Sequence, residues 1–257
     1  MNKVLVIGDG CNDVFQYGKC ERLSPEAPIP VFKPTLYKNN GGMAVNVYNN
    51  LVALGIDCDI ITESGTTKTR YVDETSNQML LRVDENDEIN EVDTDRLSMI
   101  DFDKYDAIVV SDYNKGFLDI NDIEYLANNH KHVFMDTKKE ISTWCSNIFC
   151  IKVNNKEYMR NQGWLDHMFN NILIITLGDK GAKYSHLKKK ISEQLFPIEE
   201  EHPVRDLTGA GDTFMAALVA KYLENKNVPE AIKFANKCAS WAVTQKGVSV
   251  VDLNKIL

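Results

Sequence analysis

The sequence predicts an α/β domain built on a mainly parallel sheet, on the strength of two observations. The first is a set of compact apolar runs that end in polar or glycine residues, as strands buried on both faces do. They lie at residues 4–9, 107–112, 132–137, 148–153 and 172–178. The second is a set of helical patterns between them, at 44–55, 120–130 and 229–247. Such alternation favours right-handed crossover connections, and the 257 residues suffice for one large domain.

Two segments depart from this alternation. Residues 22–34 contain four prolines, which exclude a helix and favour an edge strand or an extended flap. Residues 77–87 alternate between apolar and polar, as an exposed strand does. We therefore expect a small β layer across one end of the sheet. No internal repeat or linker interrupts the chain, so we expect a single domain over residues 1–257.

Composition excludes several classes of protein. A formal charge of −8 argues against a nucleic-acid or anionic-membrane surface. No stretch approaches the roughly 20 apolar residues of a membrane span. The six cysteines form no C-x-x-C pair, which disfavours a disulfide framework or a zinc site. We expect reduced thiols, no export signal and a cytoplasmic location.

The stretch "VRDLTGAGDTFMAALVA" at 204–220 carries the strongest chemical signal. Gly209, Ala210 and Gly211 lead into a helix, so their backbone N–H groups and the helix dipole form an anion site. Asp212, in the first turn, is placed to take a proton from a hydroxyl beside that site, as phosphoryl transfer to an alcohol requires. The alternative is an aspartate that only complements the dipole, with Thr208 as N-cap. This stretch alone does not decide between them.

Further polar or glycine-rich positions follow predicted strands or precede a helix. Residues 41–46 put a glycine pair before a helix that begins near Asn46. Asn154 and Glu157 stand at i, i+3, a spacing suited to hold water around Mg²⁺. Residues 176–181 form a strand end with two glycines that can lie against a nucleotide. Because ligands gather at the carboxyl ends of parallel strands, these positions together favour phosphoryl transfer over the alternative.

The motifs resemble those of the ribokinase-like (phosphofructokinase B) carbohydrate kinases. Residues 206–212 match that family's D-x-x-G-A-G-D signature, and Gly41, Gly42 and Asn46 match its paired-glycine signature. The resemblance covers essentially the whole chain. It implies a three-layer α/β/α sandwich with a central, mainly parallel sheet and a small β lid near 14–36 and 68–86. A lid of this kind often forms a dimer interface, so the resemblance also implies a homodimer.

The resemblance assigns a role to individual positions. Asp212 would activate the anomeric hydroxyl, and the backbone of Gly209, Ala210 and Gly211 would stabilise the transferring phosphoryl group. It implies ATP and Mg²⁺ as cofactors, with a monovalent cation as an option, and Mg²⁺ organised by Asn154 and Glu157. The implied ATP contacts are Thr176, Gly178, Gly181, Asn236 and Asn154. The implied sugar contacts are Asp9, Asp13, Gly42, Asn46 and Asp112, with Lys115 and Arg82 for a sugar phosphate.

Within this family, three segments resemble kinases that act on D-glycero-D-manno-heptose 7-phosphate. They are S-P-E-A-P at 24–28, "QMLLRVD" at 78–84 and "SDYNKG" at 111–116. The implied reaction is phosphorylation of the anomeric hydroxyl to give the 1,7-bisphosphate, for nucleotide-activated heptose synthesis in lipopolysaccharide or surface glycan. Two alternatives stay open: a kinase for another sugar or sugar phosphate, and a non-catalytic relative that binds a sugar phosphate.

The chain departs from the family pattern in ways that bear on the substrate. After residue 65 it passes directly to "TTKTRY", where relatives carry a further helix and strand, so roughly 30–40 residues are absent. We expect this to shorten the lid or open the sugar pocket. Asp136-Thr137-Lys138 stands where heptose kinases have Asp-Pro-Lys, and Met43 stands where close relatives have a small residue.

Overall fold

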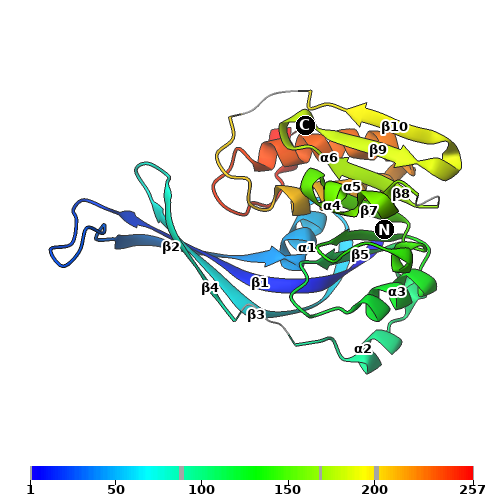
Figure 1. Ribbon diagram of the computed structural model, residues 1–257, viewed down its shortest axis with the longest axis horizontal. Helices are drawn as coiled ribbons and strands as arrows, with labels where there is room; N and C mark the ends of the chain where they lie inside the picture. The colour runs from blue at the N-terminus through cyan, green and yellow to red at the C-terminus, as the bar shows by residue number, and fades with distance from the viewer. Residues whose placement is uncertain (1, 87–89, 168–169, 200–202, 257) are drawn as a thin grey trace.

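A ten-stranded sheet organises the protein, as seen in a computed structural model that describes residues 2–86, 90–167, 170–199 and 203–256 (Figure 1). The strand order is β10-β9-β8-β7-β6-β5-β1-β3-β4, and β2 pairs with the outer part of β1. Neighbouring strands from β3 through β1 to β8 are parallel, whereas β2, β4, β9 and β10 pair in antiparallel fashion. The sheet is therefore mainly parallel, as the sequence predicted.

The elements alternate along the chain. The strands are β1 (Lys3–Lys19), β2 (Lys33–Met43), β3 (Asp57–Asp73), β4 (Met79–Glu85), β5 (Ala107–Asp112), β6 (Val133–Thr137), β7 (Cys150–Asn154), β8 (Ile172–Thr176), β9 (Ala182–His186) and β10 (Ile191–Phe196). The α-helices are α1 (Ala44–Ala53), α2 (Thr94–Ser98), α3 (Ile120–Asn129), α4 (Asn155–Leu165), α5 (Ala210–Asn225), α6 (Val228–Ala242) and α7 (Leu253–Ile256). Short 3-10 turns lie at Phe102–Lys104, Thr143–Cys145, Gly178–Lys180 and Leu187–Lys189.

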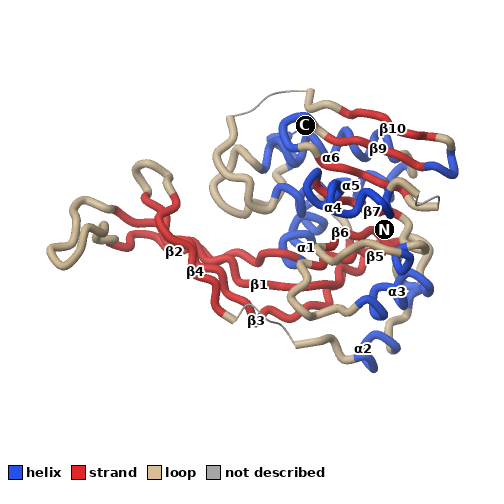
Figure 2. The backbone as a smooth tube through the Cα atoms, in the orientation of Figure 1, coloured by secondary structure: helices blue, strands red, loops and turns tan. Residues whose placement is uncertain are grey.

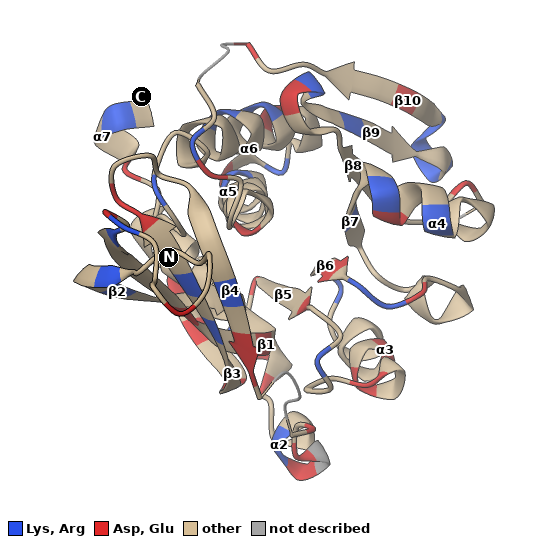
Figure 3. Ribbon diagram, turned by 60° about the vertical axis from the view of Figure 1, so that its left-hand side comes forward, with Lys and Arg blue, Asp and Glu red and all other residues tan. Residues whose placement is uncertain are grey.

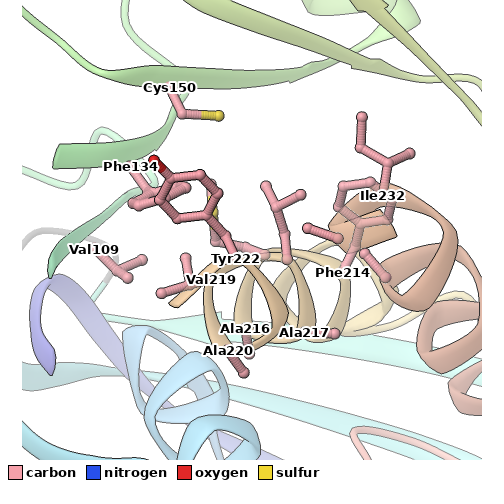
Figure 4. Close-up of a cluster of buried hydrophobic side chains, with 14 of the residues drawn as sticks. Val109, Phe134, Cys150, Phe214, Ala216, Ala217, Val219, Ala220, Tyr222 and Ile232 are labelled. Atoms are coloured by element: carbon pink, nitrogen blue, oxygen red, sulfur yellow. The ribbon is translucent and has the colours of Figure 1, made fainter. Parts of the chain in front are cut away.

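Helices cover both faces of the central strands, which gives the three layers of an α/β/α sandwich. Alternate residues of one strand belong to opposite cores: Val109 of β5 packs with α1, α5 and α6, and Ile108 packs with α2 and α3. Helix α5 lies at the centre of the first core, where Phe134 and Tyr222 pack edge to face at 5.5 Å between ring centroids (Figure 4). Most residues of α5 are buried, so its first turn is held firmly against the sheet.

The lid is a direct continuation of the central sheet. Strands β1 and β3 each run for 17 residues and remain paired from Lys3 and Asp57 outward, with one register shift between Asp9 and Cys11. Beyond that shift, β2 pairs on the free side of β1 and β4 on the free side of β3. Figure 2 shows this twisted extension reaching away from the helices.

The predicted α/β class is confirmed, as are the five strand positions and the three helical stretches. A short turn that includes residues 188–190 joins β9 to β10. For residues 22–34 we expected an edge strand or an extended flap: residues 22–32 form a loop with one bridge between Leu23 and Pro30, and β2 begins at Lys33. None of the helices in the described residues is both long and apolar enough to span a bilayer.

Candidate active site

The glycine-rich turn before α5 forms an open helix N-terminus. Gly209 is the N-cap, and its φ of +80° lies in the left-handed region that favours glycine. Asp206 holds the turn, because one carboxylate oxygen accepts hydrogen bonds from the backbone and hydroxyl of Thr208 and the other from the backbone of Gly247. Within the described residues, no acceptor faces the N–H groups of Gly211 and Asp212. Two donors at the positive end of a 16-residue helix therefore remain available to an anion.

Asp212 points away from its own helix and into a polar cluster. Its Oδ2 accepts a hydrogen bond from Asn46 Nδ2 at 3.0 Å, and its Oδ1 accepts one from the Tyr113 hydroxyl at 2.6 Å. Thr208 is not the N-cap, since its hydroxyl donates to Asp206 and the cap is Gly209. The alternative, in which Asp212 only complements the helix dipole, predicted Thr208 as the N-cap, and that prediction is wrong. The Asp212 carboxylate also has contacts that such a role does not require.

Burial makes Asp212 a stronger base than an ordinary aspartate. Its side chain is 4% exposed, and burial raises its pKa to about 6, against the hydrogen bonds from Asn46 and Tyr113 that lower it. Burial, together with the nearby Asp212 carboxylate, raises the pKa of Tyr113, which therefore remains a proton donor. The carboxylate is ionised at neutral pH with a proton affinity suited to general-base work.

A buried lysine lies against the anion site. Lys152, in β7, is 3% exposed and forms an ion pair with Asp136 at the end of β6. A Cβ on Gly211 would lie 3.1 Å from Lys152 Nζ, so the ammonium group borders the open helix terminus. The site thus holds a base, two backbone donors and a fixed positive charge, which is an arrangement suited to phosphoryl transfer.

Three predicted sugar contacts gather near the base. Asn46 is fully buried at the start of α1 and touches Asp212 directly. Asp13 and Gly42 lie diagonally across the β1–β2 pair, and a Cβ on Gly42 would lie 2.6 Å from Asp13 Oδ2. Asp13 Oδ1 accepts a hydrogen bond from Arg70 Nη1 at 2.5 Å. The structure therefore brings these three residues toward one wall beside Asp212, together with an arginine that the sequence did not single out.

Asp9 and Asp112 lie beneath this wall and support the loop after β5. Asp9 accepts hydrogen bonds from the backbone N–H groups of Tyr113, Lys115 and Phe117, and burial and the Asp112 charge raise its pKa. Asp112 accepts a hydrogen bond from Lys139 Nζ at 2.7 Å, with further bonds from the Thr137 hydroxyl and the backbone of Asn114. These carboxylates position the loop that carries Tyr113.

The two predicted contacts for a sugar phosphate lie in different places. Arg82 is on the lid strand β4, directly opposite Arg70 of β3, and donates two hydrogen bonds to Asp84. Its side chain is 42% exposed. Lys115 lies in the loop after β5, where its backbone N–H donates to Asp9.

The predicted nucleotide contacts gather partly around a pocket at the other end of the sheet. Gly181 packs against the Phe196–Pro197 backbone, and Asn236 Nδ2 donates to the Phe196 carbonyl. The pocket is lined by Pro197, Ile198, Glu199, Lys233, Asn236, Lys237, Ser240, Trp241, Thr244, Lys255 and Ile256. The Ser240 hydroxyl is buried there without a hydrogen-bond partner in the described residues, as expected of a group that binds a ligand.

Thr176 and Gly178 stand at the strand end that leads toward this pocket. Thr176 closes β8 and its hydroxyl donates to the Val153 carbonyl at 3.3 Å. Gly178 has a φ of +65° and begins the short turn that ends before Gly181. The glycines therefore serve the tight turn, and Gly181 also permits close approach of the neighbouring backbone.

Asn154 and Glu157 form a reciprocal cap at the start of α4. Asn154 Oδ1 accepts from the Glu157 backbone and Glu157 Oε2 accepts from the Asn154 backbone. Glu157 Oε1 also accepts from Lys138 Nζ at 2.5 Å. No group of three or more acidic, histidine or cysteine side chains in the described residues could hold a metal alone. One carboxylate still fits Mg²⁺, which keeps several waters and takes further oxygens from nucleotide phosphates.

Comparison with known proteins agrees with these features. The sequence pattern of the "pfkB family carbohydrate kinase" matches residues 106–255. The "Bifunctional protein HldE" of Helicobacter acinonychis is 31% identical over 312 aligned positions, which cover all of this chain and 66% of the relative. The protein of the same name from Helicobacter pylori strain J99 is 33% identical over 310 positions, with the same coverage. The chain thus spans about two thirds of the length of these relatives.

Solved structures share the fold at lower identity. Ribokinase from Thermotoga maritima superposes with a TM-score of 0.72 at 17% identity, covering 96% of this chain and 95% of that one. Phosphofructokinase-2 from Escherichia coli gives a TM-score of 0.75 at 14% identity, covering 100% and 98%. The match to the family pattern, the relatives above 30% identity and the shared fold lead to one conclusion: this chain belongs to the pfkB family of carbohydrate kinases.

Proposed function

We propose that this protein is an ATP-dependent kinase that phosphorylates the anomeric hydroxyl of D-glycero-D-manno-heptose 7-phosphate. Family membership supports a sugar kinase, and the similarity to HldE proteins over the whole chain supports the heptose phosphate. The single observation that carries the chemistry is the buried Asp212 carboxylate, which lies beside the unfilled N–H donors of α5 and beside Lys152.

The proposed reaction needs one proton acceptor and one anion site. Asp212 takes the proton of the acceptor hydroxyl, whose oxygen then attacks the γ-phosphorus of ATP, and ADP leaves with the bond electrons. Lys152 and the N–H groups of Gly211 and Asp212 stabilise the charge on the transferring phosphoryl oxygens. Mg²⁺ would be organised through Glu157 and would neutralise nucleotide phosphate charge.

Residues around the reacting centre take supporting roles in this proposal. Asn46 orients the base, while Asp13 and the close backbone at Gly42 receive sugar hydroxyls. Asp9 and Asp112 hold the loop that carries Tyr113, and we assign them to positioning. The pocket beside Asn236 is the proposed nucleotide site.

The test is ATP consumption with Mg²⁺ and the heptose 7-phosphate, with the product identified by phosphorus NMR. We expect a new anomeric phosphate, and we expect Asp212→Asn to lower kcat by about 10²- to 10⁴-fold. Turnover of another sugar or sugar phosphate in preference to the heptose phosphate would retain the kinase and overturn the substrate. Sugar binding with background ATP consumption would favour a non-catalytic binding protein.

We also propose a homodimer formed through the lid and a cytoplasmic location. Leu36, Tyr37, Met79 and Leu81 on β2 and β4 are each at least half exposed, which is an apolar surface suited to a second copy. All six cysteines are free thiols, as in a reducing compartment. Sedimentation that gave only monomer at micromolar concentration would overturn the dimer.

A further inference from the structure

Strand β3 carries two cations into the sugar side of the active site. Lys68 stands opposite Asp13 of β1, and Arg70 stands opposite Phe15. Paired residues of neighbouring strands project from the same face of a sheet, so both cations share a face with Asp13. Each is only 9% exposed. Two long basic side chains are thus buried in the wall that also carries predicted sugar contacts.

The two cations differ in their partners. Arg70 donates to Asp13 Oδ1, and its guanidinium lies 5.0 Å from the centroid of the Phe15 ring. Lys68 Nζ lies 5.9 Å from the centroid of the Tyr113 ring, and no carboxylate of the described chain lies within ion-pair distance of it. Lys68 stands opposite Asp13 on β1 and Asp84 on β4, but Asp13 accepts from Arg70 and Asp84 accepts from Arg82. A buried ammonium group without a close ion pair of its own is costly in the free protein. Its position is therefore suited to a ligand that brings a negative charge.

A neighbouring lysine shows how unusual this is. Lys138 Nζ lies 5.4 Å from the same Tyr113 ring, yet it is paired with Glu157 at 2.5 Å and with Asp136 at 3.4 Å. Lys68 has no such pair. Figure 3 shows basic and acidic segments interleaved on the lid strands and on the sheet edge next to them.

Lys68 also lies at a useful distance from the reacting centre. The Tyr113 hydroxyl donates to Asp212 Oδ1, and the Tyr113 ring borders Lys68. Lys68 is therefore about one tyrosine side chain away from the base. A sugar whose reacting hydroxyl lies on Asp212 would extend past Tyr113, so that a group at its far end meets Lys68.

We propose that Lys68 and Arg70 bind the phosphate monoester at the far end of a phosphorylated acceptor sugar. The inference rests on the proposed kinase function and names the class of acceptor, sugar phosphates in preference to neutral sugars. Arg70 has N–H donors beyond the one used by Asp13, and Lys68 supplies a point charge, a combination that suits phosphate. Asp13 Oδ2, on the side of Gly42, is left for a sugar hydroxyl.

The experiment compares Lys68→Gln with Lys33→Gln. Lys33 is an exposed lid lysine paired with Glu21, so its substitution removes the same charge away from the site. We measure kcat and KM for three pairs of acceptors: the heptose and its 7-phosphate, fructose and its 6-phosphate, and ribose and its 5-phosphate. In Lys68→Gln we expect the preference for the phosphorylated member to fall about 10- to 100-fold, mainly through KM. We expect Lys68→Arg to restore part of this preference and Lys33→Gln to keep the full preference.

The outcomes separate this inference from the proposed function. An equal loss for both members of each pair, or a wild-type preference for the neutral sugars, overturns the phosphate site and leaves the kinase intact. Absence of turnover with every sugar overturns the kinase. In that case, calorimetric binding of the same three sugar phosphates without ATP tests the phosphate site. Binding that is lost in Lys68→Gln and kept in Lys33→Gln supports the site, and any other pattern overturns it.

Discussion

Replacing the proposed base should make the protein more stable while it lowers kcat. The pKa of Asp212 is raised from 3.8 to about 6 by burial, so the folded state holds a proton more tightly than the unfolded chain does. Its contribution to stability is therefore greatest below the unfolded pKa and declines as pH rises through about 6. A difference of roughly two pKa units, at about 1.36 kcal/mol each, lowers the free energy of unfolding by about 3 kcal/mol once the pH is above both pKa values. Asp212→Asn cannot ionise and avoids this cost.

Urea unfolding at two pH values measures this effect. We expect the stability advantage of Asp212→Asn over the wild type to grow by about 2 kcal/mol between pH 4.5 and pH 8. Asp103→Asn, which removes a carboxylate from an exposed turn, serves as the matched control and should show no such growth. An advantage that is independent of pH, or a variant less stable than the wild type at pH 8, would refute the reasoning.

Two further predictions concern the groups around the base. Tyr113→Phe removes a hydrogen bond that lowers the pKa of Asp212, so the acid limb of the kcat profile should move up by about one pH unit; an unmoved limb would exclude this role. Gly209→Ala should lower the free energy of unfolding by about 1 kcal/mol or more, because the φ of Gly209 is +80°. Gly211→Ala, whose Cβ meets only the flexible end of Lys152, should instead spare stability and raise the KM for ATP; equal unfolding midpoints in urea for the two alanine variants would contradict this.

Sequence reasoning located the parts of the site that lie within one short segment. Residues 206–212 carry the turn, the helix start and the base together, so their geometry follows from local backbone rules. Lys152, Tyr113, Lys68 and Arg70 were missed as site residues because their roles arise from pairing between strands far apart in the sequence. A lysine inside an apolar strand, as at Lys152, was the one signal that sequence reasoning had available.

The first strand is longer in the structure than the sequence predicted. We expected the first strand to end at residue 9, where its compact apolar run ends. In the structure β1 continues to Lys19. A Cβ on Gly8 would lie 2.0 Å from the carbonyl oxygen of Ser111, so this glycine permits close approach of β5 and marks no turn.

One continuous strand attaches the lid at the position, after residue 65, where we expected residues to be missing. The alignment with the Helicobacter acinonychis relative spans 312 positions against 257 residues here, so it contains gaps in this chain. Across residue 65 the structure has one uninterrupted strand, β3, which leaves the core and enters the lid beside β1. Lys68 and Arg70 of this strand are buried beside β1, and a shortened lid or an opened sugar pocket stays a prediction.

A lid built this way cannot swing on a loop. Any hinge between core and lid would have to break the β1–β3 ladder, which continues from Cys11 paired with Thr66 to Gly18 paired with Asp73. We therefore predict that amide hydrogen exchange in β1 is slow on both sides of the register shift at Asp9, without and with sugar phosphate and a non-hydrolysable ATP analogue. The control is the mostly exposed loop at residues 22–32, where exchange should be fast. Exchange in residues 11–17 that is as fast as in that loop, and that slows only with ligand, would mean that the lid opens despite the shared strands.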